Sequence, residues 1–176
     1  MNLKGTLIGL SAGILLAASP ATADEARTAD LVNGDGQRIG QVIVKPVSGG
    51  VLLTAKAQRL PAGAHGFHIH ETGKCEPGEG FKTAGGHLAD GASHGFHVDG
   101  GPHPGDMPNV HVGSDGVLNV EVLNSRVQLT ESGDGALLDR DGSALMIHSG
   151  PDDYESQPSG AAGARIACAV IAEGGS

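Results

Sequence analysis

The chain is organised around residues 64–70, whose sequence is Ala64-His65-Gly66-Phe67-His68-Ile69-His70. Side chains alternate between the two faces of a β-strand, so His68 and His70 would share a face, roughly 6.6 Å apart. Two imidazoles at that spacing can bind one metal ion, and imidazole suits both copper and zinc. Such a pair also occurs on solvated strand faces, so a metal site requires further ligands elsewhere in the chain.

Further ligands are available, because the chain contains nine histidines, which fall in residues 65–70, in residues 87–111 and at position 148. Four groups of candidate residues require a common explanation. They are His68 with His70; His87 after two glycines; His94, His103 and Asp106; and His148, which precedes Pro151-Asp152-Asp153. Histidines and aspartates brought together from separate segments would form a metal site assembled by the fold.

The first 23 residues are typical of a secretory signal peptide. Lys4 supplies a positive start, residues 7–18 are an apolar run, and Ala21-Thr22-Ala23 is a small-residue cleavage site. A membrane-spanning anchor is the alternative, but a bilayer requires ~20 apolar residues. We therefore expect export to the periplasm, cleavage after Ala23, and one mature domain of residues 24–176 with no membrane attachment.

The mature chain is acidic and poor in aromatic residues. The full chain has a formal net charge of −9, and removing Lys4 takes it to −10. It contains one tyrosine and no tryptophan. Because nucleic-acid binding relies on basic patches and stacking rings, we exclude nucleic acid as a partner. An anionic substrate would have to be attracted by local positive charge.

Two cysteines, Cys75 and Cys168, are separated by 168 − 75 = 93 residues. An even number of cysteines in an exported chain predicts a disulfide. The alternative is that the two cysteines are thiolate metal ligands. The sequence favours the disulfide, because histidines are plentiful and the cysteines lack C-x-x-C spacing.

Short alternating stretches predict strands at residues 28–32, 38–45, 51–59, 64–70, 117–122, 143–148 and 165–171. Thirty glycines and nine prolines indicate turns rather than long helices. Residues 71–110 and 149–164 show no periodicity, and loops of such length are usually functional. The pattern predicts an all-β sandwich or barrel.

Together these motifs resemble the copper/zinc superoxide dismutases of the exported bacterial type. The motifs are HGFHIHETGKC (65–75), AGGH (84–87), H-x-G-D followed by MPNV (103–110), MIHSGPDD (146–153) and GARIAC (163–168). They follow the order of the family from His65 to Ile171. The resemblance implies a Greek-key β-sandwich or flattened barrel with two long functional loops.

The resemblance also implies a role for each candidate residue. The copper ligands would be His68, His70, His87 and His148, and the zinc ligands would be His87, His94, His103 and Asp106. His87 would therefore bridge the two ions. Cys75 and Cys168 would form the intrasubunit disulfide, Arg165 would lie beside the copper, and Asp152 would hydrogen-bond one copper histidine and one zinc histidine.

The activity implied by the resemblance is dismutation of superoxide. One superoxide would reduce Cu(II) and leave as dioxygen, and a second would oxidise Cu(I) and leave as hydrogen peroxide with two protons. His87 would separate from reduced copper, take a proton and deliver it to the peroxide. Arg165 would present a forked, permanently charged donor to the anion. Zinc in a closed set of four ligands would be structural.

Several points stay open in the sequence. His97 competes with His94 for the zinc, and the nine-residue spacing from His94 to His103 favours His94. Lys74 and Lys82 are candidates for steering the substrate, or they are simply solvated surface lysines. The sequence is compatible with a homodimer and does not distinguish it from a monomer.

Two other classes of function are also open. A copper-storage or copper-delivery protein could use the same histidines, but it would not need the anion-guiding Arg165. A zinc hydrolase would need an open coordination position for water, and the four expected zinc ligands leave none.

Overall fold

The computed structural model describes residues 25–175, so the predicted cleavage site after Ala23 lies outside the described residues. Its strands are β1 (Arg27–Asn33), β2 (Arg38–Val47), β3 (Gly50–Ala57), β4 (Gly63–His70), β5 (Asp106–Val112), β6 (Leu118–Asn124), β7 (Gly142–His148) and β8 (Arg165–Glu173). Two short 3-10 helices, η1 (Pro77–Glu79) and η2 (Lys82–Ala84), lie between β4 and β5. Within residues 25–175, no helix is long and apolar enough to cross a bilayer. The all-β prediction is confirmed.

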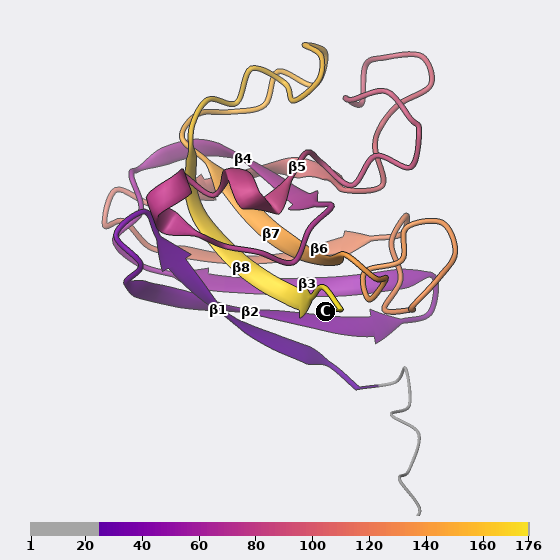
Figure 1. Ribbon diagram of the computed structural model, residues 1–176. Coiled ribbons are helices and arrows are strands. Elements are labelled where there is room, and N and C mark those ends of the chain that lie inside the picture. The colour runs from indigo at the N-terminus through magenta and orange to yellow at the C-terminus, as the bar shows by residue number, and fades with distance from the viewer. Residues whose placement is uncertain (1–24, 176) are drawn as a thin grey trace, which may run out of the picture.

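All eight strands form one antiparallel sheet in the order β5-β4-β7-β8-β1-β2-β3-β6. The two edge strands, β5 and β6, contact each other, so the sheet nearly closes into a flattened barrel (Figure 1). Since β7 returns to lie beside β4, strands β4 to β7 have the Greek-key order. The predicted topology is therefore confirmed.

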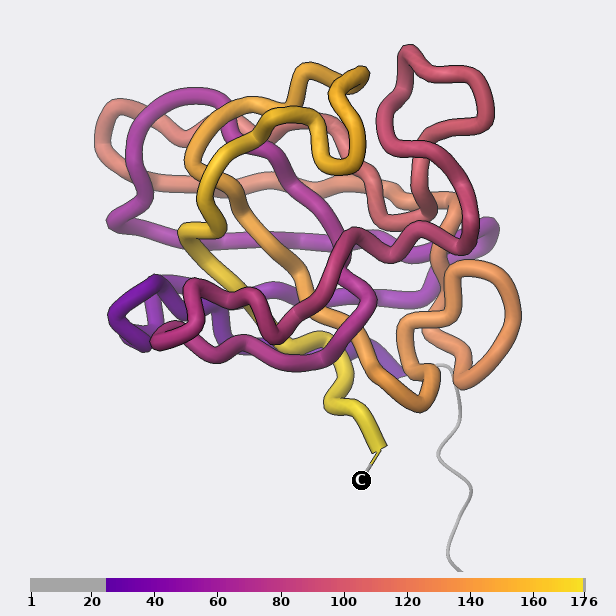
Figure 2. The backbone as a smooth tube through the Cα atoms, turned by 45° about the horizontal axis from the view of Figure 1, so that its top comes forward, coloured from indigo at the N-terminus to yellow at the C-terminus, as the bar shows by residue number. Residues whose placement is uncertain are grey.

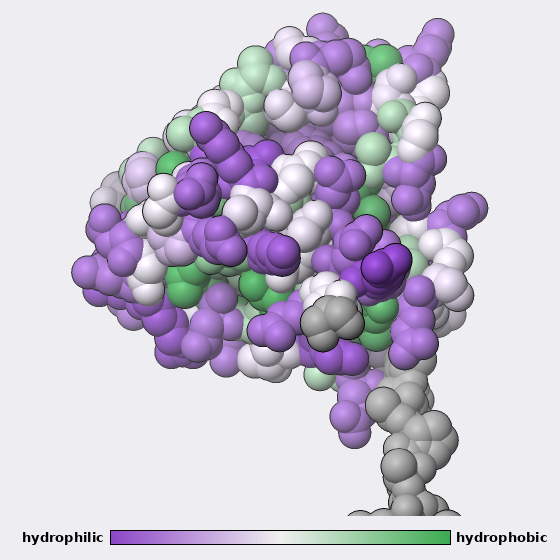
Figure 3. Space-filling view, in the orientation of Figure 1, coloured by the Kyte–Doolittle hydropathy of each residue, from purple (hydrophilic) through white to green (hydrophobic). Residues whose placement is uncertain are grey.

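Alternate side chains along the strands fill the inside of the barrel. Leu31 of β1, Leu53 of β3, Ile69 of β4 and Leu145 of β7 are all fully buried in one hydrophobic cluster. The opposite faces of β1, β2, β3 and β6 carry polar or partly exposed residues. In Figure 3 hydrophilic residues cover most of the visible face, and hydrophobic residues appear only in small separate groups.

Strand β4 is buried on both faces over its last six residues. Phe67 and Ile69 pack in the barrel core, so the alternating Gly66, His68 and His70 face outward. These outward residues are nevertheless buried, because loops cover them. The histidine pair is therefore not a solvated strand face.

Two long segments cover the outer face of β4, namely residues 71–105 and residues 149–164. Figures 1 and 2 show the second segment beside the part of the first that precedes β5, on the same side of the barrel. A Cβ atom on Gly66 would lie 2.8 Å from the Cβ of Ala162 and 3.1 Å from Cε1 of His68. Glycine at position 66 therefore lets the second loop pack closely on β4.

The first loop is shorter than the sequence indicated. The prediction extended it to Val110, whereas β5 begins at Asp106 and pairs with β4, with Met107 opposite Phe67. Met107 and Val110 are buried, so this segment belongs to the barrel core. Pro108 and Asn109 interrupt the alternation between these two residues, which explains why periodicity failed to reveal the strand.

The predicted disulfide is present and joins the first loop to β8. Cys75 and Cys168 form this bond across 93 residues of sequence. Cys168 is fully buried in a second hydrophobic cluster with Phe81 and Met146. Closing so long a loop stabilises the fold by about 4–5 kcal/mol in the chain-entropy model.

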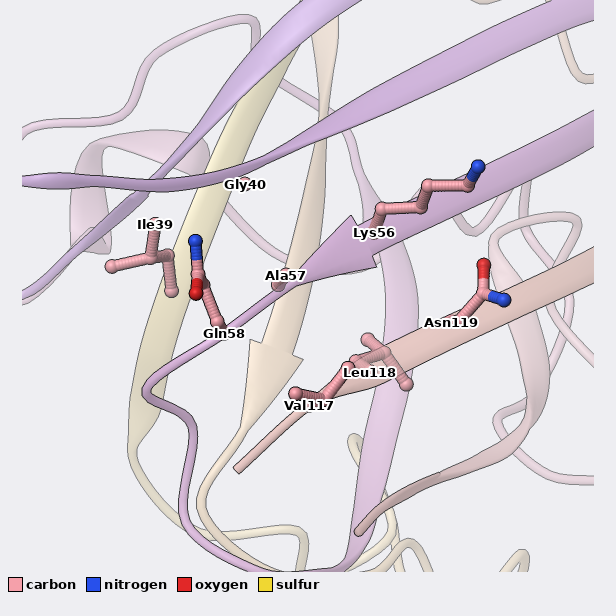
Figure 4. A pocket seen from close by; sticks show the side chains of 8 residues that line it. All are labelled: Ile39, Gly40, Lys56, Ala57, Gln58, Val117, Leu118 and Asn119. Atoms are coloured by element: carbon pink, nitrogen blue, oxygen red, sulfur yellow. The ribbon is translucent and has the colours of Figure 1, made fainter. Parts of the chain in front are cut away.

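A surface cavity of about 370 Å³ lies between β2, β3 and β6 (Figure 4). Its lining residues are Ile39, Gly40, Lys56, Ala57, Gln58, Val117, Leu118 and Asn119. In Figure 4 the amine of Lys56 extends away from Ile39 and Gln58. This lining offers one charged group and no carboxylate or imidazole, so the chemistry must be sought at the outer face of β4.

Candidate metal centre

Four histidines from three parts of the fold converge on the outer face of β4. His68 and His70 lie on β4, His148 ends the neighbouring β7, and His87 comes from the first loop, where it forms an isolated bridge with His70. All four are buried, and one potential ligand atom from each lies within 4.8 Å of the others. The order of strands in the sheet thus assembles residues that are up to 80 positions apart (148 − 68).

Each of these four rings directs one nitrogen at an oxygen atom. The contacts are His68 Nε2 to Asp152 Oδ2 at 2.8 Å, His70 Nδ1 to the Gly85 carbonyl at 3.1 Å, His87 Nδ1 to Asp106 Oδ1 at 2.9 Å, and His148 Nδ1 to the Gly163 carbonyl at 3.4 Å. Carbonyl and carboxylate oxygens only accept hydrogen bonds, so each of these nitrogens donates in the metal-free protein. At His87 Nδ1, a cation bound beside Asp106 would replace that proton. The other nitrogen of each ring is left with its lone pair.

The second nitrogens have no hydrogen-bond partner among the described residues. They are His68 Nδ1, His70 Nε2, His87 Nε2 and His148 Nε2, and all four are buried. Leaving buried polar atoms unpaired is costly, and native proteins rarely do so. A metal ion fits this arrangement, because ligating histidines usually donate their other N–H to a carboxylate or carbonyl. A set of four imidazoles suits copper.

A second group of ligands surrounds Asp106 at the start of β5. Its Oδ1 atom lies 2.9 Å from Nδ1 of His87, 3.0 Å from Nδ1 of His94 and 3.4 Å from Nδ1 of His103. The contact to His103 is within ion-pair distance but lacks hydrogen-bond geometry, so this nitrogen has no hydrogen-bond partner among the described residues. Oδ2 accepts the backbone N–H groups of Gly95 and His103, each at 3.0 Å. Three imidazole nitrogens and one carboxylate oxygen form a closed set that suits tetrahedral zinc.

The surroundings keep these groups in the protonation states that metal ligands need. Burial, together with neighbouring rings, lowers the pKa of His87 to about 4 and that of His148 to about 3. Burial raises the pKa of Asp106, but the nearby imidazoles of His103 and His87 and the hydrogen bond from the Gly95 N–H outweigh it and hold this pKa well below its usual range. At neutral pH His87 and His148 are therefore neutral and Asp106 is ionised, as metal ligands must be.

His87 belongs to both groups of ligands. Its Nδ1 atom faces Asp106, and its unpaired Nε2 belongs with the histidines of β4 and β7. Its ring centroid lies 4.0 Å from that of His68 and 5.6 Å from that of His103. One imidazole can therefore face two cations at once.

Asp152 connects the two groups from the second loop. Its Oδ2 atom accepts from His68 Nε2 at 2.8 Å, and its Oδ1 accepts from His94 Nε2 at 3.1 Å. Burial raises the pKa of Asp152, but hydrogen bonds from His68 and neighbouring groups lower it by more, so that the pKa is about 2. Asn109 of β5 holds the Asp152 backbone, since its Nδ2 donates to the carbonyl at 2.9 Å and its Oδ1 accepts the N–H at 2.8 Å.

Comparison with known proteins agrees with this geometry. The family model for copper/zinc superoxide dismutase matches residues 39–171. A copper/zinc superoxide dismutase of Aquifex aeolicus is 44% identical over 168 residues, which cover 94% of this chain and 98% of the relative. This chain belongs to the copper/zinc superoxide dismutase family. The copper/zinc superoxide dismutase of Caulobacter vibrioides is 42% identical over 147 residues, which cover 82% of this chain and 84% of the relative.

Solved structures support the same family. The superoxide dismutase-like protein of Bacillus subtilis superposes with a TM-score of 0.78 and 38% identity, covering 82% of this chain and 97% of that chain. The copper/zinc superoxide dismutase of Brucella abortus gives a TM-score of 0.67 at 30% identity, covering 84% of this chain and 99% of that chain. The present dismutase is therefore an oxidoreductase that converts superoxide to dioxygen and hydrogen peroxide with copper and zinc as cofactors.

The dismutase has a cavity of about 470 Å³ at the histidines of the first group, lined in part by His70, His87 and His148. Arg165, at the start of β8, also lines it and donates from Nη1 to the Phe81 carbonyl at 2.7 Å and from Nη2 to the Gly85 carbonyl at 2.6 Å. A guanidinium has five N–H donors, so further donors remain for an anion.

The charge around this cavity is local. Among its described lining residues, Arg165 is the only lysine or arginine, whereas Lys74 and Lys82 are exposed and lie outside the lining. Glu71 also lines the cavity, and its Oε1 accepts the Gly86 N–H at 2.8 Å. Attraction of an anion therefore depends on Arg165 and on whatever cations the histidines hold.

The structure distinguishes between His94 and His97, which the sequence left as competing zinc ligands. His97 is exposed and packs edge-on against Tyr154, while His94 is fully buried beside Asp106. The geometry thus brings His94, and not His97, into the second group. His65 contacts backbone carbonyls with both ring nitrogens, at 2.7 and 2.8 Å, so its ring braces the backbone and belongs to neither group of ligands.

Proposed function

We propose that the dismutase binds copper through His68, His70, His87 and His148, and zinc through His87, His94, His103 and Asp106. The observation that carries this assignment is the set of buried, unpaired nitrogens in the first group. The second group supports the zinc assignment by its three imidazoles and one carboxylate. Zinc there would be structural and would fix residues 85–105 against β5.

Copper in an imidazole set supplies one-electron chemistry, because such ligands accommodate both Cu(II) and Cu(I). The balanced reaction consumes two superoxide anions and two protons and yields one dioxygen and one hydrogen peroxide. Among the described residues at the cavity, His87 offers a nitrogen, Nε2, that can accept a proton and release it to the product. Its Nδ1, held on the side of Asp106, keeps the ring oriented during that transfer.

Arg165 would bind the incoming anion. Its guanidinium is fixed by the Phe81 and Gly85 carbonyls, so its remaining N–H groups are held in the cavity wall. Burial lowers the pKa of Arg165, but arginine starts so high that the side chain stays charged at neutral pH. A fixed positive charge in a cleft focuses the field locally, which an acidic chain acting on an anion requires.

We also propose that the protein is exported to the periplasm and that cleavage after Ala23 gives a mature chain starting at Asp24. The charged start, apolar run and cleavage motif of residues 1–23 support this. The disulfide also supports it, because such bonds persist in oxidising compartments. N-terminal sequencing of protein recovered from a periplasmic extract should begin at Asp24, and a chain beginning at Met1 would contradict the proposal.

The test of the ligand assignment is a superoxide-removal assay on protein loaded with copper and zinc. His148→Ala should lower the rate at least 100-fold, because it removes one nitrogen of the first group. His111→Ala is the matched control, since that histidine is exposed on β5. Equal slow rates in wild type and His148→Ala would favour copper storage. Metal analysis that finds zinc alone at full occupancy, with no copper needed for activity, would favour a hydrolytic site.

A further inference from the structure

A side-chain amide of the second loop pairs with the backbone of one proposed zinc ligand. Gln157 Oε1 accepts the backbone N–H of His94 at 3.0 Å, and Gln157 Nε2 donates to the His94 carbonyl at 2.8 Å. Nε2 also donates to the Glu155 carbonyl at 3.1 Å. One amide therefore satisfies both backbone polar groups of His94, as a neighbouring strand would.

His94 needs such support because of where it lies. Among the described residues between η2 and β5, no strand or helix is formed, and only the isolated bridge at His87 provides regular pairing. The ring of His94 is fully buried, with Nδ1 at 3.0 Å from Asp106 and Nε2 at 3.1 Å from Asp152. Contacts to the ring alone would leave the backbone that carries it free to rotate or shift.

We propose that Gln157 is a positioning residue for the zinc site, acting through the backbone of His94. This inference rests on the proposed role of His94 as a zinc ligand. The second loop contacts His94 at both ends, through Asp152 at the ring and Gln157 at the backbone, so zinc binding and ordering of that loop support each other. Contacts beyond the ligand atoms typically change metal affinity by about 10–100-fold.

The effect should be selective for zinc. Gln157 has no hydrogen bond to the copper histidines among the described residues, and its contacts are to His94 and Glu155. Asn109 provides the comparison, because it holds Asp152, which contacts both His68 and His94. Asn109→Ala should therefore weaken both metals, whereas Gln157→Ala should weaken zinc.

The experiment measures Zn²⁺ affinity by chelator competition, Cu²⁺ affinity in the same way, and the visible spectrum of Co²⁺ placed in the zinc site. Gln157→Ala should bind Zn²⁺ about 10–100-fold more weakly, with altered Co²⁺ bands and Cu²⁺ affinity within about 3-fold of wild type. Gln128→Ala is the matched control, because Gln128 is another exposed loop glutamine and its side chain forms no hydrogen bond within residues 25–175.

A second variant guards against loss of folding. Gln157→Glu keeps the chain length and the acceptor for the His94 N–H but loses the donor, so it should also weaken Zn²⁺ and alter the Co²⁺ bands. Wild-type Zn²⁺ affinity and Co²⁺ bands in either folded variant would overturn the positioning role and leave the proposed ligands intact. Equal weakening of both metals would overturn its selectivity. Unchanged Zn²⁺ affinity in His94→Ala would instead overturn the proposed zinc site, and this inference with it.

Discussion

His87 is the residue on which the two ligand groups depend, because its two ring nitrogens face different sets of side chains. Its surroundings keep it neutral. Burial lowers its pKa more than the hydrogen bond to Asp106 raises it, and the nearby His68 lowers it further. At the scale of single residues, the protonation of His87 is therefore coupled to folding, and the same holds for His148, whose pKa burial also lowers.

The free energy of unfolding of the metal-free protein should fall as pH drops below about 6.5. The pKa values of folded His87, about 4, and His148, about 3, lie below the unfolded value of 6.5. Below pH 6.5 the unfolded chain binds protons that the folded chain does not, so stability present above 6.5 is lost as pH falls toward 3. For His87 alone the loss approaches about 3 kcal/mol.

Urea unfolding of the metal-free protein between pH 8 and pH 4 measures this loss. The pKa of His70 is also lowered by burial, so three histidines contribute, and His148→Ala removes one of them and should flatten the profile. A wild-type stability that is constant over this range would contradict the account of buried, neutral histidines.

His94→Ala should weaken zinc binding at least 100-fold, whereas His97→Ala should leave it within about 3-fold of wild type. His94 is fully buried against Asp106 and Asp152, while the His97 ring lies exposed against Tyr154. Elemental analysis after dialysis against a zinc buffer gives the result. The reverse ranking of the two variants would show that the segment is arranged differently when zinc is bound.

At the scale of elements, β4 presents its apolar residues to the barrel and its histidines to the loops. The alternation of residues 64–70 predicted that division, and the motifs predicted which distant histidines would join it. The start of β5 was missed because Pro108 and Asn109 interrupt the pattern. Asn109 and Gln157 were missed as supporting residues because their side chains bind backbone atoms. Every residue type has the same backbone groups, so the sequence does not indicate which residues they bind.

Reducing the disulfide should loosen the first loop and displace Arg165. The Arg165 guanidinium donates to the carbonyls of Phe81 and Gly85 in the first loop, and the disulfide links this loop to β8 through Cys75. We expect lower activity and a free energy of unfolding reduced by up to about 4 kcal/mol. Activity and melting temperature measured after complete reduction test this, with the double variant Cys75→Ala, Cys168→Ala treated in the same way as a control for other effects of the reductant. Identical values before and after reduction would contradict it.

At the scale of the whole molecule, an acidic chain must attract an anion. The mature chain would carry −10, so only the local field at Arg165 and the metals favours superoxide. The exposed Lys74 and Lys82 do not line the cavity. The balance between a repulsive surface and an attractive cavity is a property of charge positions in three dimensions, which net charge alone does not reveal.

Raising the ionic strength from about 0.01 M to about 0.2 M should lower kcat/KM, because salt screens attraction by the cavity. Arg165→Ala should lower kcat/KM at least tenfold at low salt and should remove most of this dependence. The double variant Lys74→Ala, Lys82→Ala should stay within about 2-fold of wild type. A rate that rises with salt in the wild type would mean that repulsion by the whole surface dominates instead.

The most direct test of the shared histidine is anomalous diffraction at the copper and zinc absorption edges from crystals loaded with both metals. We expect a copper peak within bonding distance of His87 Nε2 and a zinc peak about 2.0–2.1 Å from its Nδ1. Two peaks of which at most one lies within bonding distance of the His87 ring would contradict it.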